Sequence, residues 1–408
     1  MTDRIVIAGA GPTGATAART LRAEGYTGRI VLVGAERHGP YRRPMVSKDL
    51  LAGTREIERC LLEPEKYWYD SDIELRLATR VVDIDTDRRR LWLSSGESLD
   101  YDALLLATGA RARRLEQHPP VRVRTLRGVA DIAPLRAAIE NGPLLIIGAG
   151  LVGLEVAATA RGLGAEARIL HAGAAPLDRI VPPEISDLMV DLHAEHGVRI
   201  ENDIRLAELC QIDGRGVVAT ATDGRTWTAS SALVAIGAVP DTALARTVGI
   251  VVDDGILVDE QYRTSAAGVY AAGDVASRFD PRRGRHERCE HWNSALSDGK
   301  AAAKSLLGQQ LPDSETPWGW STQYGLNLQF AGWPATYDDL IIRGSIATRN
   351  FTALALTAGA LTGAVSLGRP RDIGTARDLI ASGATRTPEA WADESIDLAD
   401  PAPVPVAP

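Results

Sequence analysis

The chain has 408 residues, of which 45% are hydrophobic and 24% charged, so it is long enough for two or three globular domains. Its formal net charge of -8 argues against a general nucleic-acid binder, which needs a basic surface to neutralise phosphates. The three cysteines, Cys60, Cys210 and Cys289, are far apart and form no Cys-x-x-Cys pair. We therefore expect neither a disulfide framework nor a zinc site, and a reducing cytoplasm is favoured.

The N-terminal segment predicts a strand, a turn, a helix and a second strand. Residues 4–8 are a β-branched run, residues 14–23 an alanine-rich helical stretch, and residues 29–34, RIVLVG, a further strand. Residues 144–148, 153–161 and 166–173 repeat this order. Both segments therefore predict βαβ units with parallel strands and right-handed crossovers.

The apolar stretch at residues 142–160, GPLLIIGAGLVGLEVAATA, is almost long enough to be a membrane span. Its regularly spaced glycines and the acidic Glu155 instead favour a buried parallel strand followed by a helix. No positively flanked, cleavable signal precedes the N-terminal strand, so we expect no membrane association.

Each βαβ unit is followed by short strands that end in an apolar strand and a glycine, Gly109 after the first unit and Gly237 after the second. The same plan thus occurs twice, with the second copy inserted as a separate domain. From about residue 317 the sequence changes to tryptophan, tyrosine and alternating strands, and it ends in a proline-rich tail expected to be disordered. We predict an α/β fold with two Rossmann-like dinucleotide-binding domains, at 1–110 with 237–315 and at 111–236, a C-terminal α+β domain at 316–395, and a tail at 396–408.

The first βαβ unit carries Gly9-x-Gly11-x-x-Gly14 between its strand and helix. In such a turn the first glycine permits the tight bend, the second lets a pyrophosphate approach the backbone, and the third allows close helix packing. Glu36 follows the next strand, where a ribose hydroxyl needs an acceptor. The alternative is a glycine-rich turn followed by an unrelated surface acid.

The second unit carries Gly148-x-Gly150-x-x-Gly153, but His171 stands after its second strand. An acid there would bind the 2′-hydroxyl of NAD, and an arginine would accept the 2′-phosphate of NADP. The choice between NADH and NADPH therefore stays open. Two dinucleotide sites in one chain have a simple explanation. One site would bind a hydride donor that diffuses in and out, and the other would hold a resident flavin dinucleotide that accepts the hydride.

Six segments together carry a more specific resemblance: PYRRPMVSKDLLAG, LLLATGA, IIGAGLVGLEVAATAR, VDEQYRTSAAGVYAAGDVA, EHWNSALSDGKAAA and PWGWSTQYGLNLQFAG. In this order, from about residue 4 to 395, the chain resembles the FAD-dependent ferredoxin reductases of bacterial cytochrome P450 and Rieske oxygenase systems. The resemblance implies a glutathione-reductase-like architecture. It also implies hydride transfer from NAD(P)H to FAD, then single-electron transfer to a [2Fe-2S]-type ferredoxin that supplies a P450 or a Rieske oxygenase.

The resemblance also implies the cofactor sites. FAD would be held by Gly9, Gly11, Gly14, Glu36, Arg43, Pro44, Lys48, Asp274 and Trp292, and NAD(P)H by Gly148, Gly150, Gly153, Glu155 and His171. The chain departs from the family pattern at Ala35, where a second acid is usual, and at Met45, where a second proline is usual. Alternatively, Asp274 is a helix N-cap and Trp292 is a core residue.

Lys48 and Glu155 resemble the family's catalytic pair beside flavin N5. The lysine can stabilise negative charge on the reduced ring, and the glutamate keeps the lysine charged and aimed. The alternative is an ordinary surface ion pair, which would contribute little.

Trp320 matches the family position near the incoming ferredoxin. Arg282 and Arg283 lie in the arginine-rich segment RFDPRRGRHER, which could steer an acidic ferredoxin, although a solvated loop fits this segment equally well. Arg369 and Arg371 are further candidates for this docking face.

The segment Arg42-Arg43-Pro44-Met45 stands where related disulfide reductases and peroxidases carry a cysteine. Without a thiol there, electrons must pass directly to an external acceptor. Alternatives are a rubredoxin reductase or NADH oxidase of the same fold, a redox-signalling flavoprotein resembling apoptosis-inducing factor, and a protein made inactive by His171. The sequence leaves open whether the protein is a monomer or a homodimer.

Overall fold

The computed structural model describes residues 3–116, 121–212, 216–281, 283–311 and 315–400. The chain divides into two compact units. The first comprises Met1–Met45, Arg55–Arg111 and Ala238–Glu315, and the second comprises Val46–Thr54, Ala112–Gly237 and Thr316–Pro408.

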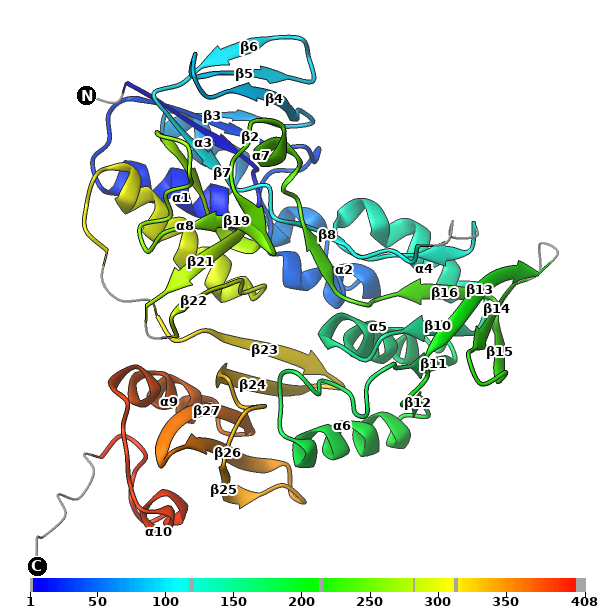
Figure 1. The fold of residues 1–408 in the computed structure, drawn as a ribbon. Helices are drawn as coiled ribbons and strands as arrows, with labels where there is room; N and C mark the ends of the chain where they lie inside the picture. Colours follow the sequence, from blue (N-terminus) through cyan, green and yellow to red (C-terminus); the bar gives the residue numbers. More distant parts are fainter. Residues whose placement is uncertain (1–2, 117–120, 213–215, 282, 312–314, 401–408) are drawn as a thin grey trace, which may run out of the picture. The chain divides into compact units, whose positions relative to one another are not determined.

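The first unit is built on a five-stranded parallel sheet in the order β20-β7-β1-β2-β3. Its strands are β1 (Arg4–Ala8), β2 (Arg29–Val33), β3 (Ile73–Arg76), β7 (Ala103–Leu106) and β20 (Val269–Ala271). Most residues of β1, β2, β7 and β20 are buried, which explains their apolar composition, whereas the edge strand β3 is mostly half-buried. Helices α1 (Pro12–Ala23) and α8 (Trp292–Leu306) pack together beside the sheet (Figure 1). Their approach is close, because a Cβ at Gly299 would lie 2.4 Å from the carbonyl oxygen of Thr13.

An antiparallel sheet and a mixed sheet complete this unit. One has the order β4-β5-β6 and the other β18-β19-β21-β22, in which only the β19–β21 pair is parallel. The bounds are β4 (Val81–Asp85), β5 (Arg90–Leu93), β6 (Ser98–Asp100), β18 (Val252–Asp253), β19 (Gly255–Val258), β21 (Ala276–Asp280) and β22 (Arg285–Glu287). The short helical segments are η1 (Arg43–Met45), η2 (Ile57–Cys60), α3 (Glu65–Asp70), α7 (Ala243–Thr247) and η4 (Gly273–Val275), and the strands β8 (Ala110–Ala112) and β17 (Ala238–Pro240) pair with each other.

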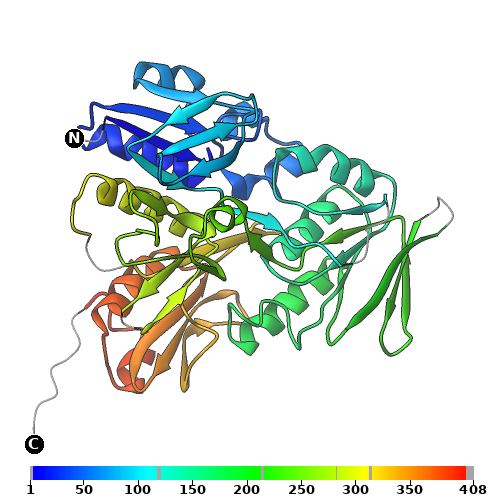
Figure 2. The ribbon, with the colours of Figure 1, turned by 45° about the horizontal axis from the view of Figure 1, so that its top comes forward.

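The second unit contains another five-stranded parallel sheet, in the order β12-β11-β10-β16-β9. Its strands are β9 (Val123–Arg124), β10 (Leu144–Ile147), β11 (Ala167–Leu170), β12 (Arg199–Glu201) and β16 (Ser231–Val234). The helical segments are α2 (Asp49–Ala52), η3 (Val129–Asp131), α4 (Ile132–Glu140), α5 (Leu151–Gly162) and α6 (Pro183–Glu195). The strands β13 (Leu206–Ile212), β14 (Gly216–Ala221) and β15 (Thr226–Ala229) form an antiparallel sheet next to it, drawn in green in Figure 2.

The C-terminal part of this unit is an antiparallel sheet in the order β23-β24-β27-β26-β25. The strands are β23 (Trp318–Gln323), β24 (Leu326–Gly332), β25 (Asp339–Ser345), β26 (Asn350–Thr357) and β27 (Ala360–Leu367), and they are followed by α9 (Pro370–Ser382) and α10 (Pro388–Ala392). The predicted α/β fold, with two Rossmann-like regions and a C-terminal α+β region, is confirmed. Among the described residues we find no helix with the length and apolar character that a membrane span requires.

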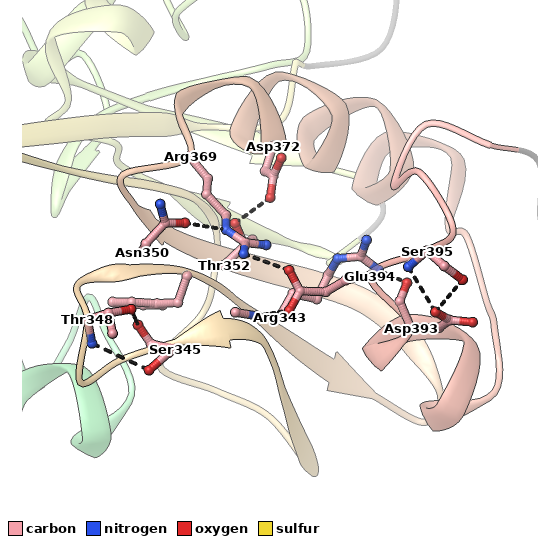
Figure 3. Close-up of polar contacts among 12 residues, drawn as sticks. Arg343, Ser345, Thr348, Asn350, Thr352, Arg369, Asp372, Asp393, Glu394 and Ser395 are labelled. Atoms are coloured by element: carbon pink, nitrogen blue, oxygen red, sulfur yellow. Dashed lines mark hydrogen bonds and ion pairs between the residues drawn. The ribbon is translucent and has the colours of Figure 1, made fainter.

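A buried arginine fastens the last described segment to this C-terminal sheet (Figure 3). The Arg343 guanidinium donates to the carbonyl oxygens of Trp391, Asp393 and Ile396 at 2.7 to 3.0 Å. Leu398 lies within the segment 396–408 that the sequence predicts as a disordered tail, but it is buried in the same core as Trp391. The packed chain therefore extends at least to Leu398, and residues 401–408 lie outside the described residues.

After β20 the chain makes only the single 3₁₀ turn η4 and no longer helix. Gly273 takes φ +76°, and the N-cap of this turn is Ala272 with no side-chain cap. Asp274 lies inside the turn, so the alternative that it caps a helix is wrong.

Candidate active site

The turn between β1 and α1 has the geometry that a dinucleotide needs. Gly9 takes φ +124°, and a Cβ there would lie 2.0 Å from the carbonyl oxygen of Ala107. A Cβ at Gly14 would lie 1.9 Å from the carbonyl oxygen of Gly9, so the helix can pack only with glycine there. At Gly11, the N-cap of α1, nothing lies within 4 Å of a Cβ position. The open space at a helix N-terminus is a cradle for a phosphate.

Glu36 lies beyond β2 in a cluster that fits a ribose site. Arg43 donates to one of its carboxylate oxygens at 2.7 Å and the Tyr41 hydroxyl to the other at 2.8 Å. Burial opposes ionisation, but the charge and hydrogen bond of Arg43 lower the pKa of Glu36 below its ordinary value. Each ionised oxygen keeps a second lone pair, so a ribose hydroxyl can still donate to it.

The other FAD candidates in this unit lie on η1, η4 and α8. Arg43 and Pro44 form η1, and burial opposes the charge of Arg43 while Tyr41, Glu36 and Asp274 together raise its pKa. Asp274 is buried in η4. Trp292, the first residue of α8, is half-buried. These side chains and the first glycine turn fit FAD.

The turn between β10 and α5 repeats the first one. Gly148 takes φ +110°, and a Cβ there would lie 2.3 Å from the carbonyl oxygen of Ala235. A Cβ at Gly153 would lie 2.1 Å from the carbonyl oxygen of Gly148, whereas Gly150, the N-cap of α5, has nothing within 4 Å. The second turn therefore offers the same open helix N-terminus, in the other compact unit.

His171 lies beside this second turn, where the sequence predicts it. Its Nδ1 accepts a hydrogen bond from the backbone N–H of Ala149 at 3.3 Å. Its Nε2 is buried and has no hydrogen-bond partner among the described residues, with the nearest Asp178 carboxylate oxygen 3.8 Å away. A buried polar atom next to the turn fits a nucleotide ribose, although it does not decide between NADH and NADPH.

Lys48 and Glu155 form a buried ion pair inside the second unit. Lys48 is the N-cap of α2, Glu155 lies on α5, and the Lys48 Nζ is 2.6 Å from Glu155 Oε1. Their side chains are 14% and 6% exposed, so the alternative of an ordinary surface ion pair is wrong. The hydroxyls of Ser47 and Ser321 also donate to the Glu155 carboxylate, at 2.5 and 2.7 Å.

Ser47 and Ser321 are site residues that the sequence analysis missed. Two further missed residues, Gln323 and His193, continue the hydrogen bonding from Ser321. The alternation of residue types along β23 could have indicated Ser321 and Gln323 from the sequence. These two residues are buried on one face of the strand, and Trp318 and Trp320 lie on the other.

The predicted docking residues have different surroundings. The half-buried Trp320 ring lies 5.9 Å from the Trp318 ring. Arg283 pairs with Glu287 at 2.9 Å, and Arg282 lies outside the described residues. Arg369 donates to Asn350 and Glu394 in the C-terminal polar network of Figure 3, which gives it a structural role.

No disulfide joins any of the three cysteines within the part of the chain that the structure describes, and Cys60 is buried. Burial raises the pKa of the Cys289 thiol to about 11, so this thiol stays protonated at neutral pH. These observations do not favour a relay of electrons through a cysteine pair.

Comparison with known proteins identifies the class. Residues 3–299 match the pyridine nucleotide-disulphide oxidoreductase family and residues 318–402 match the reductase C-terminal family. The chain belongs to the pyridine nucleotide-disulphide oxidoreductase family, and it is a flavin-dependent oxidoreductase.

The full-length similarity is to reductases of oxygenase systems. The chain is 37% identical to the ferredoxin–NAD(+) reductase component of the anthranilate 1,2-dioxygenase system of Burkholderia cepacia, over 97% of this chain and 98% of the relative. The ferredoxin reductase for the CYP199A2 system of Rhodopseudomonas palustris superposes with a TM-score of 0.92 at 36% identity, covering 97% of this chain and 98% of that one. Putidaredoxin reductase, solved in a covalent complex with putidaredoxin, superposes with a TM-score of 0.91 at 32% identity and 97% coverage of both chains. The predicted resemblance to ferredoxin reductases is confirmed.

Proposed function

We propose that the protein is an NADH:ferredoxin oxidoreductase that supplies electrons to a cytochrome P450 or a Rieske oxygenase through a [2Fe-2S]-type ferredoxin. The observation that carries this proposal is the pair of glycine turns, each with an open position at its middle glycine, one in each compact unit. The names of the full-length relatives support ferredoxin as the acceptor.

We assign FAD to the unit that contains the first turn. The N-terminal amides of α1 would bind its pyrophosphate, Glu36 a ribose hydroxyl, and Asp274 the ribityl chain. The domain ranges that we propose are 1–110 with 237–315 for FAD and 111–236 for NADH, although residues 46–54 group with the second compact unit. When bound, FAD accepts electrons as a hydride and releases them singly, which suits an iron–sulfur partner.

The Lys48 ammonium would stabilise negative charge that develops beside it, because a fixed cation in a water-poor site interacts strongly with a neighbouring anion. Glu155 holds the ammonium in place at 2.6 Å. Trp320, Arg282 and Arg283 would contact the ferredoxin. We propose that the protein acts in the cytoplasm, because its three cysteines lie far apart in the sequence and fit a reducing compartment.

The test is stopped-flow mixing of the yellow holoprotein with NADH and, separately, with NADPH, followed by addition of an oxidised [2Fe-2S] ferredoxin. We expect rapid bleaching of the flavin by NADH and reduction of two ferredoxins per NADH. Rubredoxin and oxygen serve as competing acceptors. A flavin that stays oxidised with both nucleotides would overturn the proposal, and faster reduction of rubredoxin would replace ferredoxin as the partner.

A further inference from the structure

A chain of hydrogen bonds leads away from the Lys48–Glu155 pair through the interior of the second unit. Ser321 donates to Glu155 Oε1 at 2.7 Å, and the Gln323 amide nitrogen donates to the Ser321 oxygen at 2.9 Å. The Gln323 amide oxygen lies 2.7 Å from His193 Nε2. Ser321, Gln323 and His193 are each at most 3% exposed, so every one of these bonds is made out of contact with water.

The partners fix the direction of each bond in the chain. The Gln323 amide oxygen can only accept, so His193 Nε2 carries a proton. Burial lowers the pKa of His193 to about 4, and the imidazole is therefore neutral at pH 7, with Nδ1 as an acceptor. The Tyr324 hydroxyl, 3.1 Å from Nδ1, is then the donor. From His193 to Ser321, each group accepts on one side and donates on the side nearer to Glu155.

This chain is unsuited to carrying protons. A relay would require the Gln323 amide to give up a proton to Ser321 and take one from His193, and an amide does not exchange protons in this way on the time scale of turnover. The Gln323 amide can, however, fix the orientation of the Ser321 hydroxyl. With its oxygen held by His193, its nitrogen faces Ser321, and the single hydroxyl proton of Ser321 is directed to Glu155.

Orientation matters at Glu155 because its carboxylate must serve several donors at once. Oε1 contacts both Lys48 and Ser321, while Oε2 accepts from Ser47. If the Ser321 hydroxyl turned away, the carboxylate would lose a fixed partner, and its oxygen could move with respect to the lysine.

We propose that Gln323 and His193 are positioning residues for the Lys48–Glu155 pair: His193 fixes the Gln323 amide, and Gln323 fixes the Ser321 hydroxyl as a donor to Glu155. The inference deepens the proposed function, since it assumes that this pair acts beside the flavin. Gln323 and His193 thereby influence the reaction through Ser321 and do not themselves touch the cofactor.

The test uses the FAD-loaded protein and the variants Gln323→Met, Ser321→Ala and Gln323→Met/Ser321→Ala. Two quantities are measured: the rate of flavin reduction by NADH, and the flavin midpoint potential in a reductive titration without NADH or ferredoxin. The matched control is Thr322→Val, because Thr322 lies between the two residues on the opposite face of β23. We expect each single variant to slow reduction about tenfold and make the potential more negative, with the NADH dissociation constant within twofold of the parent.

The double variant separates positioning from a general packing role. If Gln323 acts through Ser321, the double variant behaves like Ser321→Ala alone, whereas two independent packing defects would add. His193→Phe should likewise have no further effect in the Gln323→Met background.

The inference would be overturned if the flavin reduction rate and the flavin midpoint potential of both single variants matched those of Thr322→Val. Additive effects in the double variant would also overturn it. If Gln323→Met fails to fold or to retain FAD, His193→Phe, alone and combined with Ser321→Ala, gives the same comparison, because His193 is expected to act through the same Ser321 hydroxyl. A parent protein that NADH does not reduce would instead refute the proposed function, and the potentials, which need no NADH, would still decide the role of Gln323.

Discussion

The substitution Gly150→Ala should weaken NADH binding without disturbing the fold. Gly150 has φ -78° and ψ -178°, which alanine adopts readily, and nothing lies within 4 Å of the added Cβ. The methyl group would project into the space that we assign to the NADH pyrophosphate. Losing one charge-assisted hydrogen bond between a phosphate and the helix N-terminus costs about 2 kcal/mol, or about a thirtyfold increase in the dissociation constant.

The assay combines stopped-flow reduction at varied NADH concentration with flavin absorbance and thermal unfolding. Gly162→Ala, at the other end of α5, is the matched control, because its Cβ position is also open. Gly11→Ala, the equivalent change in the first turn, should instead release FAD. NADH affinity unchanged in Gly150→Ala would refute the assignment of this turn, and loss of FAD from Gly150→Ala with retention in Gly11→Ala would show that the two assignments are reversed.

Three further outcomes are expected. The pKa of His193 is about 4 in the folded protein, against an ordinary value of 6.5, so the unfolded chain binds a proton more readily than the folded one. About 3 kcal/mol of folding stability, present above pH 6.5, should therefore be lost as the pH falls to 4. Urea unfolding should show this pH dependence in the parent and a weaker one in His193→Phe, and equal slopes would contradict it. Arg343→Met should cost about 3 kcal/mol and expose the segment at 391–396 to limited proteolysis, because one buried and two partly buried carbonyls lose a charged donor. An unchanged digestion pattern would count against this role. Trp320→Ala should raise the KM for ferredoxin about tenfold in steady-state assays, as expected for an aromatic contact residue, and a KM within twofold of the parent would remove Trp320 from the docking face.

The two glycine turns could be predicted from sequence because their requirements are local. Gly9 and Gly148 need a positive φ, and Gly14 and Gly153 leave room for a backbone oxygen. Because all these requirements fall within six residues, the spacing of the glycines is enough to predict the geometry of each turn. The following parallel strands were predictable for the same reason, since burial on both faces requires continuous apolar runs.

The support of Glu155 could not be predicted in this way. Ser47 is 108 residues before Glu155 and Ser321 is 166 residues after it, and no local pattern records contacts at such separations. The resemblance to known reductases supplied Lys48 and Glu155, but it did not supply the neighbours that orient them. The grouping of Val46–Thr54 with the second unit, instead of with the flanking N-terminal sequence, likewise emerged only from the folded chain.

Strand β23 alternates strictly, with Ser321 and Gln323 on one face and Trp318 and Trp320 on the other. Inserting or deleting a single residue there would exchange the two faces, placing indole rings beside the carboxylate and small polar groups where the rings had been. Point substitutions can therefore alter either face separately, whereas a one-residue change in the length of β23 must disturb both faces at once.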